Sequence, residues 1–539
     1  MEVLPETASD TELDQLIKSR RVAIEEYKQQ LAVLCLSRNS RLPISKLPVE
    51  LLTGIFIHYA RTGGYGQPYR DGSAGVRWSS GLVLAQICHH WRGIALSSPL
   101  IWSYLDTNLC LKPHLLEISL SRSAGAALDV SISWATSSRD RHNLSDGVKR
   151  LLQECHRIRD LKLLSVLGLI AQSQKQLTPC VFSRLECLEI NIQYYATPTD
   201  TSILLQHLLQ HSPILRSVSF GNAHVDVETL LALPPTVAHL YVPTPPWYGI
   251  DLCRVIDAMQ RLSQLETLSL NIGSSTAPLE LEGIEGETVS LPKLKHLTMK
   301  DRRNIIPFFE SFILPPTIRV RLETDIDDHQ IVPIFTKLLS QSHSTCLTRS
   351  PKFTVLCELE TFFSFGLCEF GQFDACDRCQ LFVKLWGCKP IDTWIRCLNI
   401  PSTKAILSHC ESLRFKQDTY GLPHSMFVEL LSLAPDIETL LVSVGGDLNG
   451  GLIIDALRLS PNGTIPLAKL KRLDLTLDVK DPNEHFNKEE LCQCLEERKE
   501  HGCKLRSLSI RSIRTDGKTF DSYSPEIMAR LRAAVDVYE

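Results

Sequence analysis

The sequence lacks the features that mark membrane-spanning, secreted and nucleic-acid-binding proteins. It contains no uninterrupted apolar run of about 18 residues or more, and it does not begin with a charged segment followed by an apolar one. We therefore expect a soluble chain made in the cytosol, located in the cytoplasm, the nucleus or both, with no membrane partner. Lysine and arginine number 57 against 61 aspartates and glutamates, a net charge of −4, so we expect no nucleic-acid partner.

Motifs of several common enzyme classes are also missing. The chain has no G-x-S-x-G nucleophile turn, no phosphate-binding P-loop and no H-E-x-x-H zinc motif. The glycines of residues 63–75 lack the Lys-Ser/Thr pair that a phosphate loop needs. We predict a non-catalytic protein without a cofactor. The alternative, an enzyme, would require a deep pocket lined by titratable residues.

Metal-binding patterns are scarce, although the chain has 18 cysteines. Without a secretory signal we expect these thiols to be reduced, and Cys88, Cys187 and Cys397 fall inside apolar patterns that suit a small buried side chain. Cys376 and Cys379 form a C-x-x-C pair, whereas a structural zinc site needs about four ligands. The cysteines that could complete such a site lack the spacing of a zinc knuckle: Cys368, Cys388, Cys397 and Cys410. We predict no metal site, with zinc at this pair as the alternative.

Two adjacent histidines, His89 and His90, are a second candidate for metal binding or acid–base chemistry. Neighbouring residues on a helix point about 100° apart, so the two rings cannot share one ligand position. We expect one ring to be exposed and the other to be packed.

What the sequence does contain is a short, strongly apolar helical segment between residues 43 and 102. Pro48 suits the first turn of a helix and Glu50 suits its positive end. Apolar residues then recur at spacings of three and four in two predicted helices, as Leu51, Leu52, Ile55, Phe56 and Tyr59, and as Leu84, Ile87, Cys88, Trp91 and Ile94. A module of this size buries little of its own surface, so its surplus apolar area, led by Leu47 and Pro48, predicts docking onto a partner.

These residues also carry a family resemblance. L-P-x-E-L-L-x-x-I-F from Leu47, then I-C-x-x-W-R-x-I-A, and a closing P-L-I-W that ends at Trp102 resemble the F-box. The resemblance implies a subunit of an SCF-type ubiquitin ligase that binds a Skp-family subunit and, through it, a cullin. It assigns eight residues to the Skp-facing surface and its supporting core: Leu47, Pro48, Ile55, Phe56, Leu84, Cys88, Trp91 and Trp102.

One departure from the F-box pattern is an insert near residues 61–78, longer than the usual loop between the helices. Loop-closure entropy grows slowly with length, so the insert costs only about 1 kcal/mol. The alternative interpretation of residues 43–102 is an ordinary amphipathic hairpin inside a core.

A charged amphipathic helix is predicted over residues 12–36, ahead of the F-box-like segment. Its apolar seam follows a heptad pattern through Leu13, Ile17, Arg20, Ile24, Tyr27, Leu31 and Leu34. Similar helices precede the F-box of fungal proteins, and this resemblance implies an orienting stem. The alternatives are a helix folded against the F-box and a coiled-coil homodimer, for which three heptads are marginal.

The rest of the chain repeats the phrase apolar-x-x-apolar-x-apolar. Copies begin at Ile158, Leu185, Leu215, Val237, Leu265, Leu294, Ile395, Ile437, Leu470 and Leu505. Most follow a helix-like run, while Leu233–Val237 and Leu314–Ile318 replace that helix with a P-P-T approach. Such self-similarity predicts a solenoid. The phrase resembles the leucine-rich repeat, which implies a parallel sheet with helices on the convex side and exposed x positions on the concave face.

We therefore expect an α+β or α/β repeat fold in four parts. These are an N-terminal coiled-coil-like helix (1–42), an F-box (43–104), a transition (105–150) and an irregular leucine-rich-repeat-like domain (151–539) that recognises an unknown protein substrate. The spacing fails around residues 317–390, where we expect distorted repeats or an insertion. The alternatives are a mixed α/β region without a horseshoe and, for function, an interaction scaffold acting outside any ligase. Exposed x positions mix both charge signs and identify no substrate: Glu186, Arg216, Glu266, Lys295 and Arg472.

Overall fold

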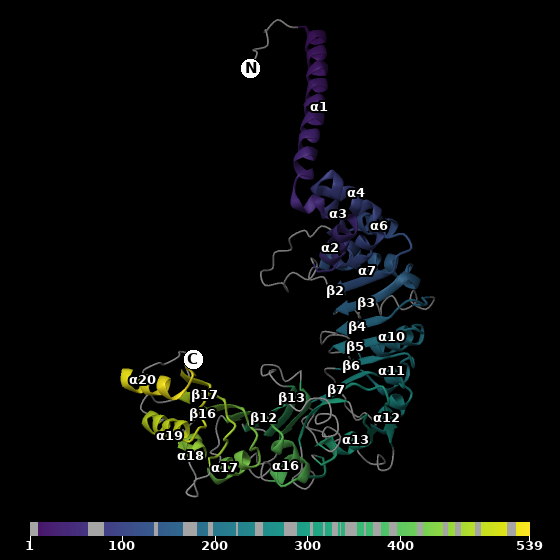
Figure 1. Ribbon diagram of the computed structural model, residues 1–539. Coiled ribbons are helices and arrows are strands. Elements are labelled where there is room, and N and C mark those ends of the chain that lie inside the picture. The colour runs from purple at the N-terminus through teal and green to yellow at the C-terminus, as the bar shows by residue number, and fades with distance from the viewer. Residues whose placement is uncertain are drawn as a thin grey trace. The chain divides into compact units, whose positions relative to one another are not determined.

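The computed structural model describes most of the chain, and helices alternate with strands along it (Figure 1). The described residues are 9–62, 80–133, 138–164, 180–191, 198–221, 225–242, 252–273, 288–301, 305–315, 318–325, 332–334, 336–339, 353–359, 363–369, 379–386, 396–417, 424–445, 451–458, 465–479, 487–514 and 524–538. None of their helices is long and apolar enough to cross a membrane. The insert of residues 61–78 lies almost wholly outside this set.

The chain divides into two compact units. The first comprises Met1–Leu188 and His211–Pro213, and the second comprises Glu189–Gln210 and Ile214–Glu539. The four-part division expected from the sequence stays a prediction.

The first unit places a group of helices before three parallel strands. Its elements are α1 (Asp10–Ser40), η1 (Pro43–Lys46), α2 (Val49–Thr62), α3 (Ser80–Ile87), α4 (His89–Ser97), η2 (Pro99–Ile101), β1 (Tyr104–Asp106), α5 (Thr107–Cys110), α6 (Pro113–Arg122), β2 (Leu128–Ser133), α7 (Ser138–Leu152), η3 (Cys155–Arg157) and β3 (Ile158–Leu164). Strand β1 pairs with β2 through Leu105 and Val130, and β2 pairs with β3 through Val130 and Leu161. Strand β4 (Cys187–Asn191) spans the boundary between the units.

Helix α1 is present where the sequence predicts a helix and is longer at both ends. Ser9 and Glu12 form a capping box that satisfies backbone N–H groups at its start. None of its residues is buried, and Ile17, Ile24 and Leu31 of the heptad seam are 49, 53 and 62% exposed. The apolar side chains of this seam are therefore largely exposed to solvent.

The single helix expected over Leu84–Ile94 is in fact two helices, α3 and α4, which is a correction to the sequence prediction. Cys88 lies between them with extended backbone angles, and its Sγ accepts a hydrogen bond from the Trp91 N–H at 3.5 Å. The thiol thus caps a new helix. The break turns Ile87 outward, where it is 54% exposed instead of lying on the buried face.

The second unit alternates helices and strands. Its elements are α10 (Pro198–Gln210), β5 (Ser217–Gly221), α11 (Val227–Leu231), β6 (His239–Val242), α12 (Leu252–Gln260), β7 (Thr267–Gly273), β8 (Val289–Ser290), β9 (His296–Asp301), α13 (Ile306–Glu310), β10 (Phe312–Ile313), β11 (Arg319–Asp325), β12 (Phe353–Leu359), β13 (Phe363–Glu369), β14 (Cys379–Trp386), α16 (Pro401–Ser408), β15 (Ser412–Gln417), α17 (His424–Ser432), β16 (Thr439–Gly445), α18 (Gly451–Leu457), β17 (Arg472–Val479), α19 (Lys488–Glu500), β18 (Ser507–Arg514), α20 (Pro525–Ala534) and β19 (Val537–Tyr538).

Two runs of parallel strands in this unit are joined by an antiparallel insertion. Strands β5, β6, β7, β9 and β11 pair in parallel, as do β15 to β19. Between the runs, β14 pairs in parallel with β11, β13 pairs antiparallel with β14 and β12, and β12 pairs in parallel with β15. The insertion occupies much of the region, around 317–390, where the phrase spacing fails. The expected loop at Gln341–Lys352 lies outside the described residues.

Burial alternates along the strands as the repeated phrase predicts. Leu240, Leu268 and Leu297 lie opposite one another on β6, β7 and β9 and are at most 1% exposed. Helices α10, α11 and α12 lie along one side of β5, β6 and β7 in Figure 1, and the fully buried Val255 and Ile256 lie on α12. The chain is thus a mixed α/β protein with a largely parallel sheet.

One copy of the phrase was assigned wrongly. Residues 396–398 of the copy that begins at Ile395 are helical, and Pro401 starts α16 directly afterwards. Proline suits the start of a helix, so α16 begins at Pro401. The strand lies instead at β15, whose phrase Cys410-x-x-Leu413-x-Phe415 opens on a fully buried cysteine.

The two P-P-T approaches are also preceded by helices, contrary to the expectation that they replace them. Helix α11 precedes Leu233–Val237, and α13 precedes Leu314–Ile318. Both helices have five residues, too few to show an apolar periodicity in the sequence.

Candidate docking surface of the N-terminal helical module

Residues 43–62 and 80–102, here called the helical module, enclose a small core of their own. Its buried members come from α2, α3, α4 and the turn after them: Leu52, Phe56, Leu84, Ala85, Ile94, Ala95, Ile101 and Trp102. Three of the eight residues that the F-box resemblance assigned, Phe56, Leu84 and Trp102, are therefore core residues, between 1 and 3% exposed.

Trp102 contributes to this core through a hydrogen bond from its indole N–H and through packing of its ring. Its indole N–H donates a hydrogen bond to the Ala95 carbonyl oxygen at 2.7 Å, so the buried polar atom is satisfied. Its ring lies close to Gly81, where an added Cβ would be 3.2 Å from the nearest ring carbon.

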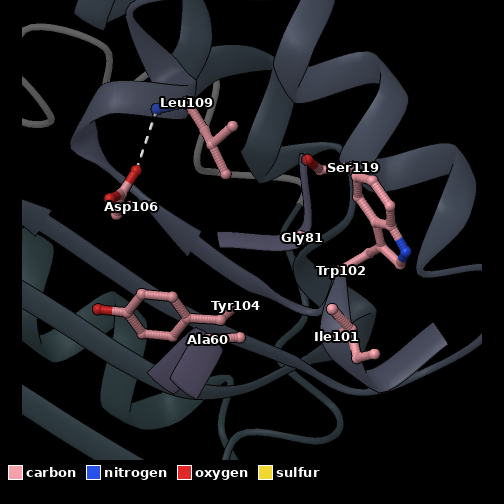
Figure 2. A pocket seen from close by; sticks show the side chains of 8 residues that line it. All are labelled: Ala60, Gly81, Ile101, Trp102, Tyr104, Asp106, Leu109 and Ser119. Carbon is pink, nitrogen blue, oxygen red and sulfur yellow. Dashed lines mark hydrogen bonds between the residues drawn. The ribbon is translucent and has the colours of Figure 1, made fainter. Parts of the chain in front are cut away.

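Beside Trp102 is a cavity of about 20 Å³, lined by residues of the module and of the segment after it (Figure 2). This volume holds a water molecule but is far below the several hundred Å³ of a small-molecule site. The cavity therefore belongs to the packing of the module and does not serve as a ligand pocket.

Trp91, Leu47 and Cys88 support the core from its margin. The Trp91 ring lies 4.7 Å from the Phe56 ring, centroid to centroid, at an interplanar angle of 52°. Leu47 and Trp91 are partly buried against the core, and Cys88 caps α4. Six of the eight assigned residues thus build or support the module.

Helix α2 presents two apolar stripes, and only one of them is buried. Leu52, Phe56 and Ala60 face the core at 0 to 1% exposure. Leu51, Ile55 and Tyr59, one residue earlier in each turn, are 57, 47 and 42% exposed. Pro48, three residues before Leu51, is also exposed and continues the same face. We call Pro48, Leu51, Ile55 and Tyr59 the exposed stripe.

Sequence reasoning placed all five apolar residues of α2 on one broad face and so missed this division. It also missed other exposed apolar residues in the module or directly before it: Leu42, Ile44, Val49, Ile87 and Leu100, which are 37 to 54% exposed. The signal was present as apolar residues at adjacent positions 51/52 and 55/56. Such pairs point about 100° apart, so one helix cannot bury both against a single neighbour.

An ionic cluster ties the end of α2 to the strands of the first unit. Arg61 Nη2 lies 2.9 Å from Asp129 on β2, and Arg159 on β3 lies 2.6 Å from the same carboxylate. Asp129 is only 8% exposed, and a buried carboxylate between two guanidinium groups resists separation. The ion pairs therefore join the C-terminal end of α2, the helix that carries the exposed stripe, to the strands of the first unit.

Two sets of residues were candidates for metal binding, the histidine pair and the C-x-x-C pair. His89 and His90 are both exposed, so the expectation that one is packed was wrong; both lie in the first turn of α4. Among the described residues no cluster of three or more His, Cys, Asp or Glu side chains could hold a metal. Cys376 lies outside those residues, and the Cys379 side chain is not described, so zinc at that pair stays untested.

Several cysteines behave as packing residues. Cys397 is buried as expected, whereas Cys88 and Cys187 are half-buried. Burial, helped by the nearby Asp106 charge, raises the pKa of the Cys110 thiol to about 12. A thiol with that pKa stays protonated and is a poor nucleophile at neutral pH.

Comparison of the chain with protein-family models found no match, and comparison with curated proteins found none either.

Proposed function

We propose that this protein is an F-box adaptor, the substrate receptor of an SCF-type ubiquitin ligase, with the helical module binding a Skp-family subunit. The observation that supports the proposal is the exposed stripe: an apolar row that begins just before α2 and continues along it, backed by a closed core, with Pro48, Leu51 and Ile55 inside the L-P-x-E-L-L-x-x-I-F motif. Exposed apolar side chains held on a rigid helix are suited to docking in a hydrophobic groove.

The proposed mechanism is non-catalytic. The chain makes and breaks no bond; it raises the local concentration of a target protein near the ligase. A stable Skp interface should bury at least about 1,200 Å², with most of the binding energy on a few apolar anchors. Leu51, Ile55 and Tyr59 are those anchors, while Phe56, Leu84 and Trp102 hold α2 in place. The protein would act in the cytoplasm, the nucleus or both.

For the second unit we propose an irregular leucine-rich-repeat solenoid that recognises the target. A recurring backbone hydrogen bond supports this. It joins the residue that follows the first apolar position of a phrase to the residue at the same position of the previous phrase, with the N–H of the later residue donating to the carbonyl oxygen of the earlier one. Glu266 donates to Ala238 at 2.7 Å and Lys295 donates to Glu266 at 2.8 Å. In the second run, Lys471 donates to Glu438 at 2.8 Å and Arg506 donates to Lys471 at 2.7 Å.

The test is co-purification of the full chain with a Skp-family subunit. We expect Leu51→Glu with Ile55→Glu to weaken capture at least about tenfold, because two charges would be buried in an apolar interface. The matched control, Ile203→Glu with Val428→Glu, changes two exposed apolar residues of the second unit and should capture normally. Leu47→Ala with Pro48→Ala is a milder test of the same surface.

Circular dichroism and thermal melting of each variant show whether it is folded. Undiminished capture by a folded Leu51→Glu, Ile55→Glu chain would rule out this surface. Recovery of a cullin in the same pull-down supports a working ligase, and capture of the Skp-family subunit without a cullin supports a scaffold acting outside one.

A further inference from the structure

A row of polar and cationic side chains crosses the open face of the first strand run in the second unit. Register places Ser217 opposite His239, His239 opposite Thr267, Thr267 opposite His296, and His296 opposite Arg319. We call these five residues the 239 row. Neighbouring strands lie about 4.8 Å apart, so the row spans roughly 19 Å across five strands.

The row lies on the face opposite the buried leucines. His239, His296 and Arg319 are exposed, and Thr267 and Ser217 are half-buried. The side chains one position further along each strand point into the core, as Leu240, Leu268, Leu297 and Val320 do. Side chains of the row therefore face outward together and present hydroxyl, imidazole and guanidinium groups.

The row lies among cationic side chains. Partial burial and then the charges of Arg319, Lys295 and His239 lower the pKa of His296, which shows that several cations lie close to one imidazole. Within the described residues, no ion pair joins a carboxylate to His239, His296 or Arg319. His239 Nδ1 is 3.2 Å from the Thr267 hydroxyl, a contact between two members of the row.

Glu266, which directly precedes Thr267, and Glu323, four residues after Arg319 on β11, are each paired with other cations. Glu266 lies 2.6 Å from Lys295 Nζ. Glu323 lies 3.0 Å from Lys300 Nζ and 2.8 Å from Arg321 Nε, and it is only 3% exposed. The hydrogen bond and charge of Lys295, and then the charge of His239, lower the pKa of Glu266, so Glu266 also partly neutralises His239. Within the described residues, no carboxylate pairs with Arg319, and a negative group from outside the unit would meet this cation.

We propose that the 239 row binds an acidic, Asp/Glu-rich segment of the target protein. This rests on the proposed receptor function and specifies the chemistry of the target. An extended chain rises about 3.3 Å per residue, so about six residues cover the row. Nucleic acid is the less suitable occupant, since the chain carries a net charge of −4 and the cations form one short row.

The test uses the full chain and fluorescent probes of about ten residues or nucleotides at low salt and pH 6.5. The probes are an alternating Glu-Ser peptide, a Gly-Ser peptide of equal length, a phosphoserine-Gly peptide and an oligo-deoxythymidine strand. We expect the Glu-Ser peptide to bind and the Gly-Ser peptide not to bind. His296→Ala with Arg319→Ala should weaken Glu-Ser binding at least about threefold, since the lost Arg319 contact is worth roughly a factor of three, while the lowered pKa leaves His296 mostly neutral at pH 6.5.

The matched control is Lys404→Ala with Arg532→Ala, which removes two exposed cations from helices of the same unit. It should change Glu-Ser affinity less than about twofold. Equal losses in the row and control variants would indicate a general charge effect and overturn the proposal. So would failure of the Glu-Ser peptide to bind, or binding only of the phosphopeptide or the oligonucleotide.

Capture of the Skp-family subunit, measured on the same preparations, separates this proposal from that of Skp binding. The row variant should capture that subunit normally, which also shows that the chain is folded. Peptide binding without Skp capture would overturn the proposed F-box function and support peptide binding by the 239 row. Skp capture without peptide binding would support the F-box function and overturn the proposal for the row.

Discussion

Gly147 controls how closely two helices of the first unit approach each other. It lies on α7, and a Cβ atom at this position would be 2.1 Å from the carbonyl oxygen of Cys110 on α5. Backbone cannot yield as a flexible side chain does, so any residue other than glycine would force the two helices apart.

Gly147→Ala is therefore expected to lower the free energy of unfolding by about 2–3 kcal/mol, as overpacking in a core does. Gly93→Ala is the matched control, because a Cβ added to that residue of α4 meets nothing within 4 Å. The control should stabilise by about 0.5–1 kcal/mol through the better helix propensity of alanine. Urea denaturation of both variants gives the comparison, and equal stability of the two would contradict this account of Gly147.

Single residues also explain where the secondary structure departs from the one that apolar spacing predicted. Cys88 caps a helix through its thiol and splits an expected helix in two. Here a local hydrogen bond outweighed the spacing of the apolar residues. Pro401 begins α16 directly after the phrase that was expected to form a strand.

At the scale of elements, the pairing of β9 with β11 depends on a charged contact as well as on backbone bonds. Glu323 on β11 lies opposite Lys300 on β9 and also accepts a hydrogen bond from Arg321. Burial by itself raises the pKa of Glu323, but the hydrogen bonds and charges of Lys300 and Arg321 outweigh it, so the pKa lies below its ordinary value of 4.5.

Because the folded pKa is lowered, ionised Glu323 stabilises the second unit at every pH above 4.5, and this contribution is lost as the pH falls through the lower folded value. We expect Glu323→Gln to be less stable than the parent at neutral pH, with a difference that shrinks as the pH is lowered below 4.5. Chemical denaturation at a series of pH values measures this. A difference that stays constant from neutral to acidic pH would refute the ionic role.

The elements also show what kept the region around 317–390 from following the repeat. Strands β12 and β13 run antiparallel, with β13 between β12 and β14, so two parallel runs are joined by a hairpin-like insertion. An antiparallel pair needs only a short turn, whereas a parallel step needs a crossover of about a dozen residues or more, usually with a helix. The phrase spacing therefore disappears where the connection changes type.

At the scale of the whole molecule, α1 stands apart from the packing of the first unit. No residue of this 31-residue helix is buried. A helix without a buried face contributes little to the stability of the rest of its unit, since helical stability in proteins comes mostly from tertiary packing.

Removing residues 1–40 is accordingly expected to leave the thermal midpoint of the remaining chain within about 2 °C of the parent. Leu52→Ala, which empties a fully buried core position, should lower the free energy of unfolding by about 2–5 kcal/mol in either background. Light scattering of the parent and the truncated chain should give one chain per particle in both. A midpoint lowered by more than about 5 °C would instead support a helix packed on the module. A particle mass that falls to about half when residues 1–40 are removed would support the coiled-coil homodimer.

Local sequence by itself determined the helix over residues 10–40, most repeat strands and the apolar helices of the module, because those depend on apolar spacing within a few turns or residues. Only the tertiary structure decided which stripe of α2 is buried, that β12 to β14 interrupt the parallel runs, and that residues from five strands form the 239 row. Each of these depends on neighbours distant in the chain. The free energies involved depend on burial and on the distances between charges, and neither can be read from a short stretch of sequence.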